Sequence, residues 1–496
     1  MLASLLSRLP HPTHRTSTRF WNQAMAASRQ LTIDASPPEA RWMKETLDRS
    51  AFHRSIPILA ARVPPAQTGL MLKAEAMKRS VMNLPKVRSV VSDPADSNNR
   101  LVLLRVQHEA DLSPEAKTYL EHQNAVLTMY TLELDYDYWT ADEILQAVLP
   151  ENILEGSPTG FAITGHLAHL NLNDEYLPYK YIIGQVVLDK NKRIRTVVNK
   201  LNSIDTQFRF FKMELIAGEP NFIVEHHESD CRFTFDFSKV YWNSRLHTEH
   251  ERLVRQFDPT DIVADVFAGV GPFAVPAARK GCAVFANDLN PESYKWLVRN
   301  ISDNKVGDLV RASCEDGREF IRKVALEGLD IPFPPYTGPK ATRSQLKEKR
   351  RQQQGPPIAP ATEVTAIATP TEPSNTLQPP SRSRISHFVM NLPDSAITFL
   401  DAFRGIFSGE KERQLYHDSP MPMVHCHCFT RELEPELAKQ DITERVQDRM
   451  GMGRALGSVE KDAVSLHLVR SVAPNKDMYC ISFRLPREVA FEAVEA

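Results

Sequence analysis

The feature that most constrains the fold of this chain is a short apolar run that ends in two closely spaced glycines. Residues 262–267 are apolar apart from Asp265, and they predict a buried strand that turns sharply into a helix. A second apolar run, residues 282–286, ends shortly before another acid, Asp288. A strand, a Gly-x-Gly turn, a helix and a second strand with an acid at its end predict a parallel α/β sheet with a nucleotide-binding crevice.

The acids and glycines of this segment favour one class of nucleotide cofactor. Gly269 and Gly271 let the backbone approach a ligand closely, and the Asp288 carboxylate can accept hydrogen bonds from ribose hydroxyls. The third glycine of a dinucleotide fingerprint is missing, because Ala274 stands in its place. The leading acid, Asp265, suits a cationic sulfonium better than a pyrophosphate. We therefore expect S-adenosylmethionine as the cofactor.

The C-terminal half continues to alternate between strand-like and helix-like patterns. This alternation predicts a doubly wound parallel sheet, and the short connection between the last two strands predicts that the final strand inserts antiparallel. Strands are expected at residues 262–267, 282–287, 309–314, 387–392, 422–429, 464–470 and 478–484, and helices at 291–303, 316–327, 394–407 and 440–449.

The ends of the third and fourth predicted strands carry two further candidate ligand-binding groups. Asp316 and Gly317 follow the third strand, where an acid can accept from the exocyclic amine of adenine and a glycine lets the backbone approach the ring. Asn391, two residues before Pro393, ends the fourth strand. This spacing resembles the Asn/Asp-Pro motifs of methyltransferases that act on nitrogen, in which the oxygens orient an amine or a ring nitrogen. The alternatives are an ordinary Asp-Gly turn and a helix cap at Asp394.

The chain divides into segments of different composition. Residues 1–35 form a leader, residues 36–125 a small mixed α/β module, and residues 126–240 a strand-rich second module. Residues 241–496 form the cofactor-binding domain, and within it residues 331–385 are rich in proline and polar residues, which predicts a disordered insertion. The basic run of this insertion is either a solvated charge cluster or an RNA-attracting arm or nuclear signal.

The leader has the composition of a targeting segment. The first 33 residues contain arginines and hydroxyl residues but no Asp or Glu, which is typical of a mitochondrial presequence; the alternative is an ordinary disordered terminus. Met25 could serve as a second start that omits most of the leader. We expect the mitochondrial matrix plus the cytoplasm, with a nuclear pool if the basic run of the insertion acts as a signal.

Composition excludes some classes of function and weakens others. No run approaches the roughly 18 apolar residues of a membrane span. The net charge is −2, so RNA binding would need a local basic face. The six cysteines are scattered, which indicates reduced thiols. His425, Cys426, His427 and Cys428 alternate, so in a strand the two kinds of ligand face opposite sides, and we expect no metal site.

Residues 241–253 by themselves predict only an amphipathic helix with alternating charges. Together with other motifs they carry a resemblance. In order along the chain, YWNSRLHTEHERLV, DVFAGVGPFAVPAA, ANDLNPES, NLPDSA and VRSVAPNKDMYCISF closely resemble the tRNA (guanine-37 N1)-methyltransferases of archaea and eukaryotes, and GHLAHLNL and RFFKMELIAGEP upstream match that family too. The likeness covers about residues 50–490 except the insertion.

The resemblance implies a class I (Rossmann-like) methyltransferase domain preceded by two smaller tRNA-recognition modules of α/β or α+β type. It implies S-adenosylmethionine as the cofactor, tRNA bound through its anticodon loop and elbow, no membrane partner, and a monomer. The implied activity places a methyl group on N1 of guanine 37, 3′ to the anticodon, which supports reading-frame maintenance. By motif position the cofactor-binding residues are His250, Asp265, Phe267, Gly269, Gly271, Asp288, Leu289, Asp316, Gly317 and Asn391.

The resemblance also implies the groups that act on the substrate. Glu249 is then the base, Arg209 holds the guanine oxygen, and Asn391 orients the ring nitrogen. Guanine N1 keeps its proton at neutral pH, so its methylation needs a base, and the charge that builds on the neighbouring oxygen suits a guanidinium. The alternatives are the aminocarboxypropyl transferase of wybutosine synthesis, a non-catalytic tRNA-binding scaffold, and a small-molecule methyltransferase. Substrate contacts are expected at Tyr241, Asn243 and Arg245.

Overall fold

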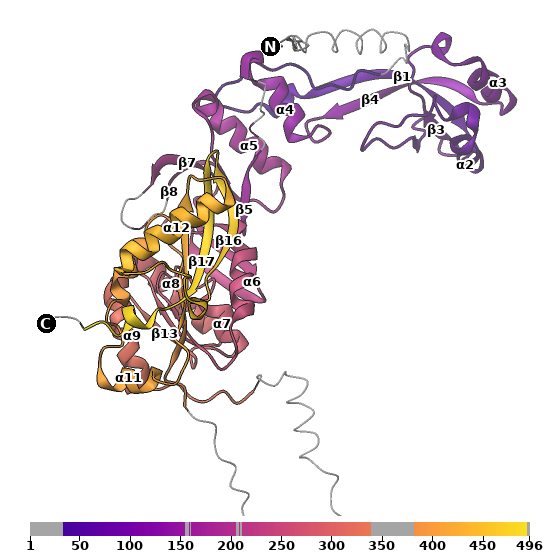
Figure 1. Ribbon diagram of the computed structural model, residues 1–496. Helices are drawn as coiled ribbons and strands as arrows, with labels where there is room; N and C mark the ends of the chain where they lie inside the picture. The colour runs from indigo at the N-terminus through magenta and orange to yellow at the C-terminus, as the bar shows by residue number, and fades with distance from the viewer. Residues whose placement is uncertain are drawn as a thin grey trace, which may run out of the picture. The chain divides into compact units, whose positions relative to one another are not determined.

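The computed structural model describes residues 33–153, 158, 160–204, 208, 211–338 and 381–493. The chain divides into two compact units (Figure 1): a first unit of Met1–Gly160 and Asn173–Asn191, and a second unit of Phe161–Leu172 and Lys192–Ala496. No described helix is long and apolar enough to cross a membrane. The leader predicted at residues 1–35 lies almost entirely outside the described residues.

The first unit is built on a four-stranded antiparallel sheet in the order β2-β3-β1-β4. Its long strands, β1 (His53–Val63) and β4 (Val126–Asp135), pair along most of their length. The domain boundary predicted between residues 125 and 126 is therefore not where the structure divides the chain, because β4 completes the same sheet as β1. The other elements of this unit are η1 (Arg49–Ala51), α2 (Pro65–Lys73), η2 (Glu75–Met77), β2 (Val90–Ser92), β3 (Arg100–Leu103), η3 (Glu109–Asp111), α3 (Pro114–His122), α4 (Ala141–Val148), η4 (Glu151–Ile153), η5 (Asp174–Tyr179) and α5 (Lys180–Lys190).

The second unit begins with a small mixed sheet in the order β5-β6-β7-β8 and a two-stranded hairpin of β9 and β10. Phe233 and Phe235 of the hairpin pack against Trp242 and share one apolar core with the large sheet that follows. This shared core explains why the structure shows no division at the predicted boundary of 240/241. The strands are β5 (Ala162–Thr164), β6 (Leu167–Leu170), β7 (Thr196–Ile204), β8 (Phe211–Gly218), β9 (Ile223–Glu228) and β10 (Cys231–Asp236).

The large sheet has seven strands in the order β13-β12-β11-β14-β15-β17-β16. The strands from β13 to β15 are parallel, and β17 inserts antiparallel between β15 and β16, so the predicted doubly wound sheet and its final strand are confirmed. The strands are β11 (Ile262–Asp265), β12 (Ala283–Asn287), β13 (Val310–Ser313), β14 (Ile385–Met390), β15 (Met423–Thr430), β16 (Ser465–Ala473) and β17 (Lys476–Arg484).

Helices cover the two faces of this sheet, and each face has its own apolar core. The helix predicted at residues 394–407 is a 3-10 helix, η7 (Ala396–Phe403), in a run whose aromatic and β-branched residues have low helix propensity. β12 and β13 lie on one side of β11 in the sheet, and β14 and β15 lie on the other side. At such a reversal of the strand order, the carboxyl ends of parallel strands leave a crevice for a ligand. The remaining elements are η6 (Ser244–Leu246), α6 (His247–Gln256), α7 (Ala274–Lys280), α8 (Pro291–Asp303), α9 (Gly317–Asp330), α11 (Glu410–Tyr416), α12 (Pro435–Met450), η8 (Glu460–Asp462) and α13 (Arg487–Ala490).

Both ends of the predicted insertion, 331–385, are part of the folded sheet domain, so its predicted limits are wrong. Phe333 is buried and forms a backbone bridge with Arg382. The Arg382 guanidinium is buried and donates to the carbonyl oxygens of Pro334 (2.9 Å), Pro259 (3.1 Å) and Gly281 (2.8 Å). Composition concealed these contacts, because the few folded residues lie next to a long polar run. Residues 339–380 of the predicted insertion lie outside the described residues.

Arg382→Ala is expected to lower the free energy of unfolding by about 1–3 kcal/mol, because it removes a buried guanidinium that donates to three partly buried carbonyl groups. Urea unfolding followed by circular dichroism measures this change. Arg384→Ala is the matched control, since Arg384 is partly exposed and donates to one carbonyl, that of Pro420. Equal losses in the two variants would contradict a structural role for Arg382.

Candidate active site

The turn after β11 is shaped by two glycines and held by an acid from the next strand. Gly269 and Gly271 have φ values of +56° and +100°, which glycine adopts without strain. A Cβ atom on Gly271 would lie 2.9 Å from the side chain of Leu297, so no larger residue fits there. The Asp288 carboxylate accepts from the backbone amides of Gly269 (2.8 Å) and Asn290 (2.9 Å). Asp288 thus joins the ends of two neighbouring strands and keeps further lone pairs for a ligand.

Asn287, which the sequence analysis did not single out, holds three strand ends in place. Its side-chain amide donates to the carbonyl oxygens of Val266 (3.2 Å) and Glu315 (2.9 Å). Its Oδ1 accepts from Ser313 Oγ (3.0 Å) and from the Glu315 amide (3.0 Å). The available signal was an amide at the end of a fully buried strand, because a buried polar group needs partners.

Asp265 lies fully buried at the carboxyl end of β11. Neither of its carboxylate oxygens has a hydrogen-bond partner of ordinary geometry among the described residues. Burial, together with the nearby Asp288 carboxylate, raises the pKa of Asp265 to about 8. Burial also raises the pKa of Asp288. A buried acid without partners is costly, so this crevice fits a ligand that brings a positive charge or an amine.

The ends of β13 and β14 contribute the other predicted groups at the crevice. Asp316 caps α9 by accepting from the amide of the second residue of that helix (2.8 Å). A Cβ atom on Gly317 would lie 2.9 Å from the ring of Phe267, which explains the glycine. Asn391 Oδ1 is buried without a hydrogen-bond partner in the described part of the chain, so it can accept from a ligand. Leu289 is exposed on the loop after β12.

His250, a predicted cofactor contact, is buried on α6 and bound to an acid of the hairpin. Its Nδ1 lies 2.6 Å from Glu228 Oε1, and its ring packs edge-on against Phe273. Burial acts to raise the pKa of Glu228, but hydrogen bonds from His226 and His250 outweigh it and bring the pKa to about 2. The pair ties β9 to α6, and sequence reasoning missed Glu228 because no local pattern marks it.

Glu249, the predicted base, is buried in a cluster of polar side chains from α6 and three adjacent strands. The Arg252 guanidinium donates to both carboxylate oxygens, from Nε to Oε2 at 2.6 Å and from Nη2 to Oε1 at 2.8 Å. His427 Nε2 lies 2.7 Å from Oε1, and His467 Nε2 lies 3.7 Å from Oε2. Cys480 sits between the two histidines in the sheet, because it pairs with His427 on one side and His467 on the other.

The charges of this cluster make Glu249 a weak base in this arrangement. Burial acts to raise the pKa of Glu249, but hydrogen bonds from Arg252 and His427 lower it well below its usual range. Burial acts to lower the pKa of His427, but Cys480 and Glu249 raise it. Proton removal by Glu249 therefore requires one of its partners to withdraw. Arg209, the predicted partner of the guanine oxygen, lies outside the described residues.

The same cluster has donor atoms that suit a metal ion. One atom each of Glu249, His427 and Cys480 lie within 4.8 Å of one another. A carboxylate, an imidazole and a thiolate are ligands of zinc-like ions. In this arrangement, however, the Arg252 guanidinium already neutralises the Glu249 carboxylate. The expected lack of a metal site remains a prediction, which metal analysis of the purified protein would test.

The predicted substrate contacts lie beside a positively charged region of the small sheet. Tyr241 is 45% exposed and Arg245 is exposed, whereas Asn243 caps η6 by accepting from the Arg245 amide (3.2 Å). Burial, with the charges of Lys200 and Arg245, lowers the pKa of His169 to about 4. Burial and Arg245 also lower the pKa of Lys200. Arg470 acts on the Tyr241 hydroxyl, and cations close to an exposed aromatic ring suit a polyanion with stacking bases.

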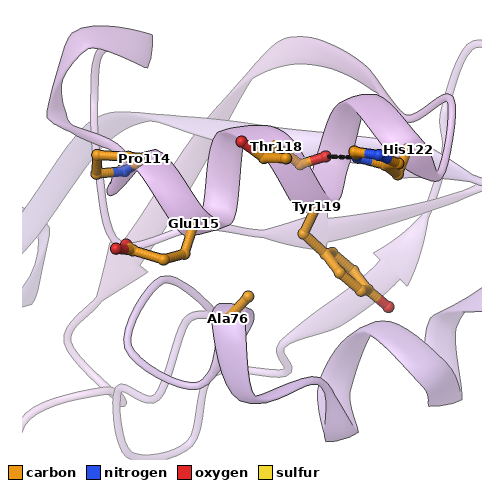
Figure 2. Close-up of a pocket in the computed structure, with 6 residues that line it drawn as sticks. All are labelled: Ala76, Pro114, Glu115, Thr118, Tyr119 and His122. Carbon is orange, nitrogen blue, oxygen red and sulfur yellow. Dashed lines mark hydrogen bonds between the residues drawn. The ribbon is translucent and has the colours of Figure 1, made fainter.

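A surface hollow in the first unit is lined by none of the predicted site residues. Figure 2 shows its lining, in which the His122 ring hydrogen-bonds to the backbone oxygen of Thr118 at 2.6 Å. This contact spans one helical turn of α3 and satisfies the last turn of that helix. The hollow is lined by Ala76, Pro114, Glu115, Thr118, Tyr119 and His122.

Comparisons with known proteins agree with this geometry. The family profile described as the TRM5/TYW2 methyltransferase domain matches residues 224–332, and the TYW2 N-terminal domain matches residues 141–221. The chain is 58% identical to the tRNA (guanine(37)-N(1))-methyltransferase of Coprinopsis cinerea over 94% of this chain and 99% of that protein. It is 44% identical to the Saccharomyces cerevisiae protein of the same name over 92% and 95% of the two chains.

Two solved structures with the same fold align over most of this chain. The crystal structure of Trm5b from Pyrococcus abyssi aligns with a TM-score of 0.50 and 22% identity, over 86% of this chain and 99% of that chain. The complex of aTrm5 with tRNALeu aligns with a TM-score of 0.54 and 17% identity, over 86% of this chain and 100% of that chain. At these identities the likeness shows the fold.

Proposed function

The chain belongs to the family of tRNA (guanine(37)-N(1))-methyltransferases, and from this premise we propose that it transfers a methyl group from S-adenosylmethionine to N1 of guanine 37 in tRNA. This modification, 3′ to the anticodon, supports reading-frame maintenance. The observation that carries the proposal is a crevice with a buried acid at the end of β11 that has no side-chain hydrogen-bond partner among the described residues, together with a buried carboxylate on α6. The first suits a cationic cofactor, and the second suits removal of a proton.

The residues at the strand ends fit S-adenosylmethionine, which supplies an activated methyl group on a sulfonium cation when bound. Asp265 would balance the positive charges of this ligand, and Asp288 would accept from its ribose hydroxyls with the lone pairs that the backbone leaves. Asp316 would accept from the adenine amine. Asn391 Oδ1 would accept from the guanine that enters beside the cofactor, which fixes the direction of N1.

Proton removal falls to Glu249 in this proposal, and Arg209 would steady the guanine oxygen as negative charge builds on it. The tight pairing of Glu249 with Arg252 supports a resting state in which the base is blocked. An incoming polyanion offers Arg252 other acceptors, and withdrawal of this arginine would free one carboxylate oxygen.

The bound substrate is tRNA, and finer features of its binding are also proposed. Tyr241 and Arg245, beside the positive charges of Lys200, would contact the anticodon loop, and the first unit would reach the elbow. We further propose that the protein acts as a monomer. Sedimentation of the protein with and without tRNA tests the stoichiometry, and a complex with two protein chains would contradict the last point.

One assay separates the proposed function from its alternatives. Wild-type protein is incubated with labelled S-adenosylmethionine and unmodified tRNA, and the modified nucleoside is mapped by mass spectrometry. A methyl group on N1 of guanine 37 is the expected product, and a transcript with adenine at position 37 is the control. An aminocarboxypropyl group would indicate the wybutosine-type transferase, and no product would indicate a binding scaffold.

Asp288→Ala is expected to weaken cofactor binding by about 1–3 kcal/mol. It removes the acceptor for the ribose hydroxyls and the carboxylate that accepts from the Gly269 amide and so stabilises that turn. Isothermal titration calorimetry with S-adenosylhomocysteine measures the change. Glu292→Ala is the matched control, since Glu292 lies four residues later, on the surface of α8 near Lys295. Unchanged binding in Asp288→Ala would show that the pocket is misassigned.

We also propose that the leader directs part of the protein into mitochondria and that the remainder stays in the cytoplasm or enters the nucleus. The acid-free composition of the first 33 residues supports import. A fusion of these residues to a fluorescent reporter is expected to reach the mitochondrial matrix. A version in which the arginines are replaced by glutamine should stay diffuse, and a diffuse signal from the native leader would contradict the proposal.

A further inference from the structure

The two closest partners of Glu249 differ in how far they are buried. The His427 side chain is completely buried, and it comes from β15, an interior strand of the large sheet. The Arg252 side chain is 25% exposed and comes from the same helix as Glu249, three residues later. A partly exposed arginine can swing toward an anionic ligand, whereas a histidine packed inside a sheet cannot move far. His427 is therefore the fixed partner of Glu249, and Arg252 is the releasable one.

The contact of His427 is also the one that can set the direction of the carboxylate. His427 Nε2 lies 2.7 Å from Glu249 Oε1, so the proton is assigned to Nε2 because a carboxylate only accepts. Hydrogen bonds to a charged acceptor are short and directional. Glu249 Oε2 is instead bound by Arg252 Nε, with His467 further away at 3.7 Å. Departure of Arg252 would leave Oε1 held and Oε2 open.

We propose that His427 is a positioning residue for methyl transfer: by donating to Oε1 of Glu249, it holds the carboxylate so that Oε2 accepts the guanine N1 proton. This inference rests on the proposed function, because it takes Glu249 as the base. His427 does not touch the guanine and acts only through Glu249. Its Nδ1 has no hydrogen-bond partner in the described part of the chain, whereas its Nε2 bonds to Glu249 and Cys480 also lies close to the ring.

This positioning role predicts a specific change in the pH dependence of the methylation rate. A carboxylate base works only when it is ionised, so the rate falls as the pH falls through its pKa. His427 and Arg252 both lower the pKa of Glu249. Removing His427 therefore raises the pKa of Glu249. The acidic limb of the pH–rate profile, where the rate falls because Glu249 is protonated, then moves to higher pH. Other groups that act on the pair are His467 and Cys480 from the neighbouring strands, His425 from the same strand and Asp265 from β11.

The test compares two substitutions of similar volume. His427→Leu fills the space without a donor, whereas His427→Gln keeps an N–H near the position of Nε2. Single-turnover methylation is measured from pH 3 to 9 with saturating S-adenosylmethionine and tRNA, because the pKa of Glu249 lies at about 2 in the wild type. We expect the single-turnover rate of His427→Leu at pH 7 to be lower than that of the wild type by about tenfold or more. The acidic limb of its pH–rate profile should lie about one pH unit higher. His427→Gln should stay within about threefold of the wild type at pH 7.

His425→Leu is the matched control, because His425 lies on the same strand and the same face but bonds to His387 and Ser482. It should leave the acidic limb in place, because burial lowers the pKa of His425 well below its usual range and the uncharged ring then acts only weakly on the pair. A wild-type limb and rate in His427→Leu, or an equal shift in His425→Leu, would overturn the inference. If His427→Leu fails to fold, His427→Asn, which is too short to reach Oε1, replaces it in the comparison with His427→Gln. A wild-type enzyme that does not methylate guanine 37 would instead refute the proposed function.

Discussion

Replacing Glu249 with Gln is expected to slow single-turnover methyl transfer by roughly a hundredfold or more, the usual scale for losing a general base. The amide keeps the shape of the side chain and can still accept from Arg252, but it cannot take the N1 proton. Because this interaction matters mainly in the transition state, the rate should fall further than the affinity for tRNA or cofactor. The residual rate should rise with pH as solvent takes over deprotonation.

Glu251→Gln is the control for this substitution, because Glu251 lies on the same helix, is largely exposed, and pairs with Arg255. Its single-turnover rate should match that of the wild type. Thermal unfolding of both variants checks that the loss in Glu249→Gln is chemical, since this variant also weakens a buried ion pair. An unchanged rate in Glu249→Gln would make the residue an ion-pair partner only, and another base would have to be sought.

Asp265→Asn is expected to stabilise the cofactor-free protein by a few kcal/mol near pH 7, with an upper limit of about 5 kcal/mol. The unfolded chain loses the Asp265 proton at the ordinary value of 3.8, whereas the folded chain keeps it to about pH 8. Between these values the folded state binds more protons, so the stability of the wild type falls as the pH rises. Asparagine does not titrate, so the variant escapes this loss.

Urea unfolding of wild type and Asp265→Asn at pH 5 and at pH 8 measures the effect, and the gap between them should widen at the higher pH. The same variant should bind S-adenosylmethionine more weakly, because it no longer offers a negative charge to a cationic ligand. Asp330→Asn, a change at an exposed acid at the end of α9, is the control. A gap that is constant with pH would show that Asp265 is ionised in the folded protein.

The sequence by itself determined which groups meet at the cofactor crevice. Asp265, Asp288, Asp316 and Asn391 each lie at or just after the carboxyl end of a different strand, and parallel strands end at the same edge of a sheet. The parallel sheet and the antiparallel insertion of β17 were predictable for a similar reason, since alternating patterns and connection lengths leave few topologies. Local periodicity was therefore sufficient to predict the large sheet and the groups at its strand ends, but not the limits of the N-terminal modules or of the insertion.

Only the tertiary structure decided the partners of these groups. Glu249 and His427 are 178 positions apart, and their contact depends on how α6 packs across β15. The role of Arg382 depends in the same way on carbonyl groups from three other segments. Such pairs leave no local pattern, because a side chain finds its hydrogen-bond partner by packing in space. The sequence predicted Glu249 on α6 as the base. Only the fold shows that Arg252 and His427 bind its carboxylate and that His427 is fully buried.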